Sequence, residues 1–301
     1  MKALAVDSLT KRYGSVRAVE DVTFHIERGE VFGYLGPNGS GKTTTIRCLM
    51  GFLRPTAGVC EVLGKRIIHG RATQHRRIGY LPGDFQIWPG RRGRKSLDLL
   101  GALGQSPKLR STQRALAERL EVDLDRRVGT LSKGNRQKIG VISAFQHQPD
   151  LLILDEPTSG LDPLMRQIVM ELIREATAGG ATVLLSSHDL SEVSAVCERA
   201  AILREGRLVE VAPISEIVQR GERRLKVWFG EGDRPPAGLP GSLTGARIIE
   251  RSGNLLEIAY QGRASAVIQW LAPYDVDRIA TPQTSLEEAF MQYYQGKKHR
   301  D

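Results

Sequence analysis

A glycine-rich loop that ends in lysine and threonine constrains this chain more than any other feature. The loop, Gly36-Pro37-Asn38-Gly39-Ser40-Gly41-Lys42-Thr43, matches the spacing G-x-x-x-x-G-K-[ST] in full. The apolar run Val31–Leu35 precedes it and predicts a buried strand, and the residues from Thr44 to Met50 predict a helix. In this context backbone N–H groups surround a polyphosphate at the positive end of the helix. The sequence therefore predicts a nucleotide site in which Thr44 extends the loop, Lys42 reaches the β- and γ-phosphates and the Thr43 hydroxyl holds Mg²⁺.

A second element combines an apolar run with two carboxylates. Residues 151–154 are all aliphatic, and Asp155 and Glu156 follow at once. This pattern predicts a buried parallel strand whose tip emerges at the nucleotide. Asp155 would bind Mg²⁺, directly or through water, and Glu156 would act beside the attacking water as a general base or orienter. The loop alone also fits small GTPases, nucleotide kinases and recombinases, and an ordinary strand ending in a polar turn is the alternative for this run taken alone.

A polar segment, Leu131-Ser132-Lys133-Gly134-Asn135-Arg136-Gln137, lies between these two elements. Here the sequence resembles the nucleotide-binding domains of ATP-binding-cassette (ABC) transporters, whose LSGGQ-type signature precedes the second acidic strand by a similar interval. Lys133 and Asn135 depart from that signature, whereas Ser132 and Gly134 are retained at positions that contact a γ-phosphate in the family. A serine hydroxyl and a glycine N–H at a helix N-terminus can form a second anion site. The resemblance implies that this site faces the phosphate loop of a partner subunit.

Three further elements match the family in order and spacing. The segment Ser159-Gly160-Leu161-Asp162 resembles the D-loop, and the resemblance places Asp162 at the nucleotide interface. His188 follows the apolar run 182–185 and matches the switch histidine that touches the γ-phosphate and the attacking water. Tyr13 stands where the family stacks an aromatic ring on adenine, a contact that contributes about 1–3 kcal/mol in comparable sites. An exposed tyrosine without a role is the alternative.

The segment Ile78–Phe85 departs from the family pattern. It occupies the place of the Q-loop, where a glutamine completes the magnesium shell and links the nucleotide to the membrane partner. This chain has Gly83 at that position, with Asp84 adjacent and Gln86 three residues further on. We hypothesise that Gln86 or Asp84 reaches the metal, or that water substitutes. A cassette that binds ATP and hydrolyses it poorly is the other alternative, and the intact carboxylate and histidine argue against it.

The 301 residues are enough for one large and one small domain. Residues 1–215 predict an α/β fold, a P-loop NTPase cassette with a mainly parallel sheet covered on both faces and a helical subdomain at about 84–145. Residues 220–301 predict a small C-terminal α+β domain, which resembles the extension of cassettes that serve ABC-2-type export permeases. The large domain has strand-like runs at 19–26, 31–35, 151–154, 182–185 and 200–203; the small one has strands at 225–229, 246–250 and 255–260 and helices at 264–271 and 285–294.

Composition limits the partners. Hydrophobic residues make up 41% of the chain, yet the longest apolar stretches are strand-length, so none can span a bilayer. The scattered residues Cys48, Cys60 and Cys197 predict reduced core thiols in a cytosolic protein.

The formal charge of +9 suggests an anionic partner. The basic run at 90–95 predicts a solvated face, with lipid head groups or an acidic coupling segment as the alternative, and the sequence has no nucleic-acid-binding motif.

The resemblance to ABC cassettes implies that this chain is the ATPase subunit of an ABC exporter. Such a subunit would bind ATP and Mg²⁺ at the inner face of the cell membrane and drive an integral-membrane permease. The sequence shows no internal repeat, so a second copy or a related cassette would close head to tail with this one on two ATP molecules. Two other functions stay open: a soluble ABC ATPase that acts on ribosomes or DNA, and a nucleotide-binding regulatory module without turnover. The soluble class carries paired cassettes or coiled-coil insertions, and this chain has neither. The sequence does not indicate the cargo.

Overall fold

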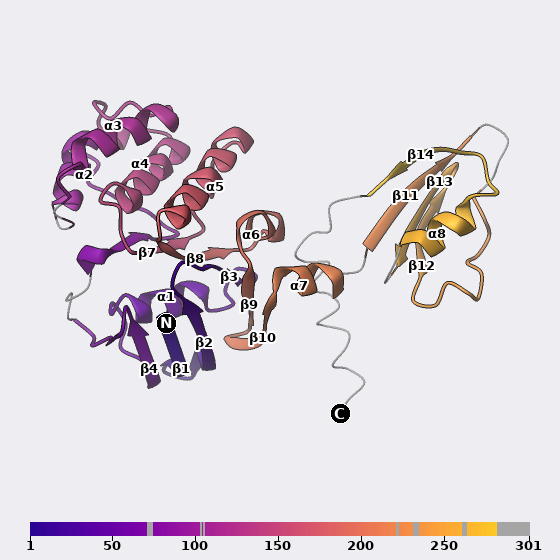
Figure 1. Ribbon diagram of the computed structural model, residues 1–301, viewed down its shortest axis with the longest axis horizontal. Coiled ribbons are helices and arrows are strands. Elements are labelled where there is room, and N and C mark those ends of the chain that lie inside the picture. Colours follow the sequence, from indigo (N-terminus) through magenta and orange to yellow (C-terminus); the bar gives the residue numbers. More distant parts are fainter. Residues whose placement is uncertain are drawn as a thin grey trace. The chain divides into compact units, whose positions relative to one another are not determined.

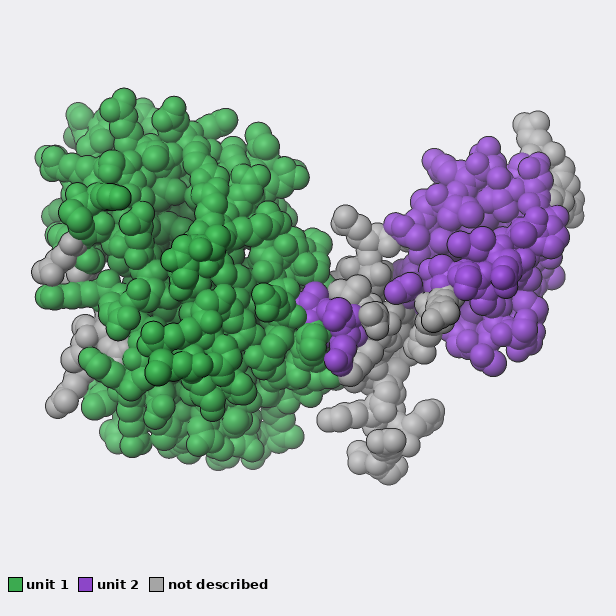
Figure 2. All heavy atoms as spheres, viewed as in Figure 1, with its two compact units in different colours: residues 1–213 green, residues 214–301 purple. Residues whose placement is uncertain are grey.

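The structure is a computed structural model that describes residues 1–70, 75–102, 104, 106–220, 223–230, 235–260 and 264–281. The chain divides into two compact units, Met1–Pro213 and Ile214–Asp301, which Figure 2 colours separately. Each unit has its own cluster of buried apolar side chains. Among the described residues, no helix combines the length and the apolar character that crossing a bilayer requires.

A mainly parallel sheet forms the centre of the first unit (Figure 1). In the described part of the chain it has six strands in the order β10-β9-β3-β8-β7-β6, and only the edge strand β10 runs antiparallel to its neighbour. Every residue of β3, β7 and β8 is buried, which is typical of uniformly apolar strands covered on both faces. The predicted α/β cassette fold is confirmed. The strands are β3 (Val31–Leu35), β6 (Ile78–Leu81), β7 (Leu151–Asp155), β8 (Thr182–Ser187), β9 (Arg199–Arg204) and β10 (Arg207–Pro213).

A separate antiparallel sheet in the order β2-β1-β4-β5 corrects one prediction. The run at 19–26 was predicted to belong to the parallel sheet, but it lies in β2 and pairs antiparallel with β1, with Leu4 opposite Ile26. The reason is visible in its pattern, since buried Val22, Phe24 and Ile26 alternate with more exposed residues, as in a strand with one face on the core. The strands are β1 (Lys2–Tyr13), β2 (Val16–Glu27), β4 (Ala57–Val62) and β5 (Lys65–Arg66).

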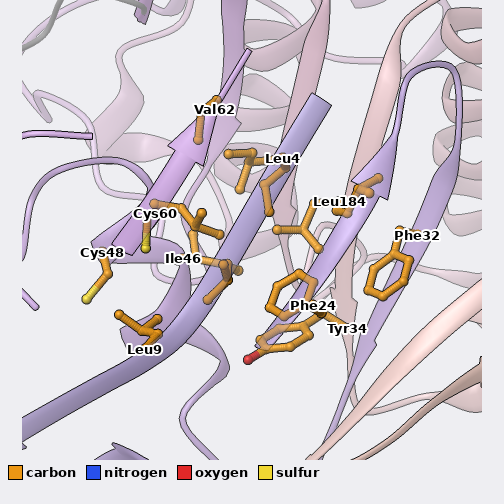
Figure 3. Close-up of a cluster of buried hydrophobic side chains, with 14 of the residues drawn as sticks. Leu4, Leu9, Phe24, Phe32, Tyr34, Ile46, Cys48, Cys60, Val62 and Leu184 are labelled. Carbon is orange, nitrogen blue, oxygen red and sulfur yellow. The ribbon is translucent and has the colours of Figure 1, made fainter. Parts of the chain in front are cut away.

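The main core lies between the two sheets and includes helix α1 (Lys42–Leu49) (Figure 3). The ring of Phe24 stacks on those of Phe32 and Tyr34, with centroids 5.6 and 5.2 Å apart. The Tyr34 hydroxyl donates a hydrogen bond of 3.0 Å to Thr45 Oγ1 in α1. Burial raises the pKa of Tyr34 far above its usual value, so the hydroxyl remains a donor. The core thus fixes the helix that begins directly after the glycine-rich loop.

The three cysteines are buried and free. Burial raises the pKa of Cys48 to about 11 and that of Cys60 to about 12, and it raises the pKa of Cys197 still further. All three thiols are therefore protonated at neutral pH and act as small apolar side chains. This agrees with the prediction of reduced core thiols.

Helices surround the parallel sheet. In Figure 1, α2 (Gly93–Gly101), α3 (Leu109–Arg119) and α4 (Lys133–Phe145) gather beside α5 (Pro163–Ala178). Arg119 of α3 donates two hydrogen bonds of 2.6 and 2.9 Å to Glu175 of α5, which ties this helical group to the rest of the unit. Helix α6 (Leu190–Val196) packs closely on β3, since a Cβ at Gly33 would lie 2.4 Å from Val193 Cγ1. The described residues of this unit also include the short 3-10 helices η1 (His75–Arg77) and η2 (Val128–Thr130).

The second unit is a four-stranded antiparallel sheet, counted over its described residues, in the order β12-β13-β11-β14. Helix α8 occupies the predicted range 264–271, and the three predicted strands form within three residues of the predicted ends, whereas β14 was not predicted. The helix predicted over 285–294 lies outside the described residues. The elements are α7 (Ile214–Arg220), β11 (Arg223–Phe229), β12 (Arg247–Ser252), β13 (Leu255–Tyr260), α8 (Ala264–Leu271) and β14 (Val276–Ala280).

Candidate functional site

The glycine-rich loop connects β3 to α1, as its motif requires. Gly39 and Gly41 have φ values of +80° and +104°, which residues other than glycine rarely adopt. A Cβ at Gly36 would lie 2.4 Å from Ser40 Oγ, so the backbone also passes this hydroxyl too closely for a side chain. Ser40 Oγ is buried and has no hydrogen-bond partner among the described residues. A phosphate oxygen in this loop would supply the acceptor that a buried hydroxyl needs, so the loop fits a polyphosphate.

Lys42 turns its ammonium group back into the loop. Its Nζ donates hydrogen bonds to the carbonyl oxygens of Gly36 (2.5 Å) and Pro37 (3.3 Å), and it lies 3.3 Å from Glu156 Oε1. The side chain is only 6% exposed. A buried cation held by two loop carbonyls and one carboxylate is placed to bind phosphate oxygens instead, because these are stronger acceptors than carbonyls.

The predicted metal ligands lie next to each other. Thr43 Oγ1 donates a hydrogen bond of 2.7 Å to Asp155 Oδ2, and the hydroxyl of Ser186 on β8 donates to Asp155 Oδ1. Asp155 is fully buried at the end of β7. The described residues contain no cluster of three His, Cys, Asp or Glu side chains that could hold a metal alone. One hydroxyl and one carboxylate suit Mg²⁺, which keeps waters and binds mainly through substrate phosphates.

Position 83 lies directly against this carboxylate. A Cβ at Gly83 would be 3.3 Å from Asp155 Oδ2, so a longer polar side chain here would contact this carboxylate. The Gln86 amide instead donates a hydrogen bond of 2.9 Å to Asp84 Oδ2, and both side chains are exposed. The structure therefore pairs the two candidate substitutes with each other and leaves glycine beside Asp155.

Glu156 stands between a cation and an imidazole. Its Oε1 faces Lys42 at 3.3 Å, and its Oε2 lies 2.7 Å from His188 Nδ1. Its backbone has φ +53°, a left-handed conformation that is uncommon outside glycine and is concentrated at functional sites. The carboxylate has little solvent exposure (17%) and points toward the loop that would hold the phosphates. This arrangement can orient a water molecule and accept its proton.

One contact of this glutamate was not predicted. The Gln137 amide donates hydrogen bonds to the carbonyl oxygens of Glu156 (3.2 Å) and Pro157 (3.0 Å). The sequence does contain a signal, because Gln137 stands on the same helical face as Gly140, Val141 and Ala144, which are buried. A polar side chain on an apolar helix face must find a partner.

The signature residues begin helix α4. Ser132 Oγ accepts a hydrogen bond of 3.2 Å from the Asn135 backbone and so caps the helix. A Cβ at Gly134 would lie 2.9 Å from the carbonyl oxygen of Gly160, so the signature turn rests on the D-loop of the same chain. Asp162 caps α5 through a hydrogen bond of 3.0 Å from the Met165 backbone.

Tyr13 ends β1 and is 47% exposed, with Lys11 Nζ 5.1 Å from the ring centroid. Its ring is therefore accessible to a stacking partner, and its predicted contact with adenine stays a prediction. The other predicted residues of the nucleotide interface likewise stay predictions.

The fold and this site define a P-loop ATPase cassette, and comparison with known proteins gives the family. Residues 19–159 match the family described as ABC transporter. Daunorubicin resistance ATP-binding protein DrrA3 of Streptomyces coeruleorubidus is 33% identical over 96% of this chain and 95% of its own length. Bacitracin transport ATP-binding protein BcrA of Bacillus licheniformis is 35% identical over 75% of this chain and 74% of its own. The chain belongs to the ATP-binding proteins of ABC transporters.

Solved structures agree with this assignment. The structure of an ATP-binding subunit of an ABC transporter is 32% identical, with a TM-score of 0.65, over 71% of this chain and 91% of that one. A bacterial ABC transporter cassette solved as a dimer has a TM-score of 0.65 over 70% of this chain and 98% of that one; at 23% identity it supports the fold alone. The resemblance inferred from the sequence is confirmed, and this chain is an ATP-binding subunit of a transporter.

Proposed function

We propose that this chain hydrolyses ATP to drive a partner membrane permease in export, through ATP-dependent head-to-tail pairing of two cassettes. The observation that carries the proposal is the position of Glu156, which is held between Lys42 and His188 and follows directly on Asp155. A base, a phosphate-binding cation and a metal-binding carboxylate are thus the constituents of one site.

Each residue of the site has a distinct role in this proposal. The loop from Gly36 to Thr43 and the ammonium of Lys42 hold the phosphates, and Tyr13 stacks on the adenine. Thr43 and Asp155 would hold Mg²⁺, with water or Gln86 as a further ligand, and the ion would neutralise charge on the phosphates. When Lys42 turns to the phosphates, it releases Glu156 Oε1, and this carboxylate then orients the attacking water and accepts its proton. His188 fixes Glu156 through Oε2 and contacts the γ-phosphate.

Pairing of two cassettes follows from the second anion site. Ser132 and Gly134 stand at the N-terminal end of α4, where a helix favours a phosphate oxygen. Ser132 and Gly134 of one copy would complete the binding site for a phosphate held by the loop of the other copy. Asp162 would lie near this contact between the two copies. One cassette with the same fold has been solved as a dimer. Export is supported by the relatives, which include Nod factor export ATP-binding protein I of Paraburkholderia xenovorans at 38% identity over 70% of this chain and 71% of its own length.

A groove beside the site is the proposed permease contact. It has a volume of about 430 Å³ and is lined by residues of the 83–89 segment, of η2 and of α4. Trp88 stands next to it, 44% exposed, and the Arg91 guanidinium lies 5.3 Å from the centroid of its ring. Within the basic run, Arg94 is already paired with Asp125, so Arg91 is better placed to meet an acidic permease segment.

The test is phosphate release by the full chain with and without its permease. We expect Mg²⁺-dependent hydrolysis that Lys42→Ala abolishes, because the phosphates lose their main cation. The Gln86→Ala and Asp84→Ala variants test whether either side chain binds the metal. If both variants keep the parental rate of ATP hydrolysis, water is the remaining ligand. Unchanged turnover in Lys42→Ala would refute the proposal. Turnover that ribosomes or DNA stimulate, but the permease does not, would favour a soluble ABC ATPase, and ATP binding without turnover would indicate a regulatory module.

A further inference from the structure

Gln137 joins the signature helix to the catalytic turn. Its side chain is buried (5% exposed), and its amide nitrogen donates to two consecutive carbonyl oxygens, those of Glu156 at 3.2 Å and Pro157 at 3.0 Å. Gln137 lies in the first turns of α4, five residues after the cap residue Ser132. One side chain therefore bridges the helix that carries the second anion site and the turn that carries the general base.

The turn that Gln137 holds is conformationally demanding. Glu156 is in the left-handed region at φ +53°, and such a conformation persists only when its surroundings fix it. The backbone N–H of Glu156 donates to the Ser186 carbonyl at 3.1 Å, which anchors the β8 side of the turn. Gln137 anchors the α4 side. Without its amide, the two carbonyls would lie in a buried region with fewer donors, and the direction of the Glu156 side chain would be less restricted.

Gln137 also lines the groove proposed above as the permease contact, together with Gly83, Lys133 and Arg136. Gly83 has no side chain with which to connect this groove to the catalytic carboxylates. Gln137 does have one, and its amide reaches the turn between Asp155 and the D-loop. A displacement of α4, whether by a phosphate at Ser132 or by a segment in the groove, would act directly on the hydrogen bonds to Glu156 and Pro157.

From these contacts we propose that Gln137 is a positioning residue, which aligns Glu156 with the attacking water and makes turnover depend on the placement of α4. The inference rests on the proposed function, because it assumes that Glu156 is the general base. It assigns no chemistry to Gln137 itself. Its amide acts through the backbone of the turn, so its loss should slow the chemical step and leave nucleotide binding by Lys42 and the loop intact.

The experiment compares two buried glutamines in the full chain. Gln137→Met keeps the length of the side chain and removes the donor. Gln113→Met is the matched control, since Gln113 is 1% exposed and its amide donates to Gln146 Oε1 at 2.8 Å in the helical group. For each variant the measurements are kcat, KM for ATP, the Kd of a fluorescent ATP analogue and the melting temperature. Gln137→Asn, which keeps the amide on a shorter side chain, provides a second variant if Gln137→Met does not fold.

We expect Gln137→Met to lower kcat about tenfold or more, as for a displaced catalytic group, with KM and Kd within about twofold of the parent. Gln137→Asn should lower kcat by less, and Gln113→Met should keep kcat even if it lowers the melting temperature equally. A Gln137→Met variant with parental kcat overturns the inference, and so does a kcat loss that Gln113→Met matches. Glu156→Gln distinguishes the two proposals. Parental ATPase activity of Glu156→Gln would contradict the proposed function. An inactive Glu156→Gln together with parental kcat in Gln137→Met would contradict only the inference about Gln137.

Discussion

Two glycines of the phosphate loop offer a test of the loop geometry in which each is the control for the other. Gly39 and Gly41 both have positive φ, +80° and +104°, so alanine at either position is strained by about 1–2 kcal/mol. They differ in their surroundings. A Cβ at Gly39 would have no atom within 4 Å, whereas a Cβ at Gly41 would lie 2.5 Å from the carbonyl oxygen of Ala18 and 3.1 Å from Val19 Cγ2. A backbone carbonyl cannot rotate away, so this overlap adds about 1–3 kcal/mol at Gly41.

We therefore expect Gly39→Ala to lower the free energy of unfolding of the first unit by about 1–2 kcal/mol, and Gly41→Ala to lower it by about 2–5 kcal/mol. The assay is hydrogen-exchange mass spectrometry in increasing urea, without nucleotide, on peptides from β3 and β8, which report on the first unit alone. Equal destabilisation by the two substitutions, or a larger effect at Gly39, would show that the Ala18 carbonyl does not add to the cost at Gly41.

Two further predictions concern His147 and Gly83. Burial lowers the pKa of His147, and the hydrogen bond of its ring with the Ile78 carbonyl only partly opposes this shift. Below about pH 6.5 the unfolded chain therefore binds more protons than the folded chain. The free energy of unfolding should consequently fall from pH 7 to pH 5. Urea unfolding at both pH values should show a smaller fall in stability for His147→Gln than for the parent chain, and an equal fall in the two proteins would contradict this cause. Gly83→Gln places an amide beside Asp155 and should lower the Mg²⁺ concentration for half-maximal ATPase by about tenfold. Gly83→Ala is its control, and an equal Mg²⁺ requirement in the two variants would exclude a new metal contact.

Much of the site could be predicted because its chemistry sits in short local patterns. The loop from Gly36 to Thr43 and the pair Asp155–Glu156 each follow an apolar run, and His188 follows a third. In a parallel sheet the carboxyl ends of the strands share one edge, so residues distant in sequence meet there. The structure brings Lys42, Glu156 and His188 together in this way.

What the sequence did not reveal depends on contacts between distant segments. The antiparallel pairing of β2 was missed because its alternating pattern was counted with the uniformly apolar strands. The positive φ of Glu156 is a property of the folded backbone. The hydrogen bond from Gln137 to this turn depends on the packing of α4 against the segment after β7. The pairing of the Gln86 amide with Asp84 is a further contact that the sequence did not reveal, and the role of Gln86 as a metal ligand stays a prediction.

We propose that two copies of this chain enclose ATP, each supplying residues that the other lacks. Glu156→Gln tests it most directly, because glutamine keeps the size of the side chain but cannot accept the proton of the attacking water. The measurement is the molar mass by size-exclusion chromatography with light scattering, with and without saturating ATP and Mg²⁺. We expect the molar mass of Glu156→Gln to double with nucleotide, and the added substitution Lys42→Ala to abolish the doubling. A Glu156→Gln variant that binds ATP yet stays monomeric would show that nucleotide does not pair the two copies.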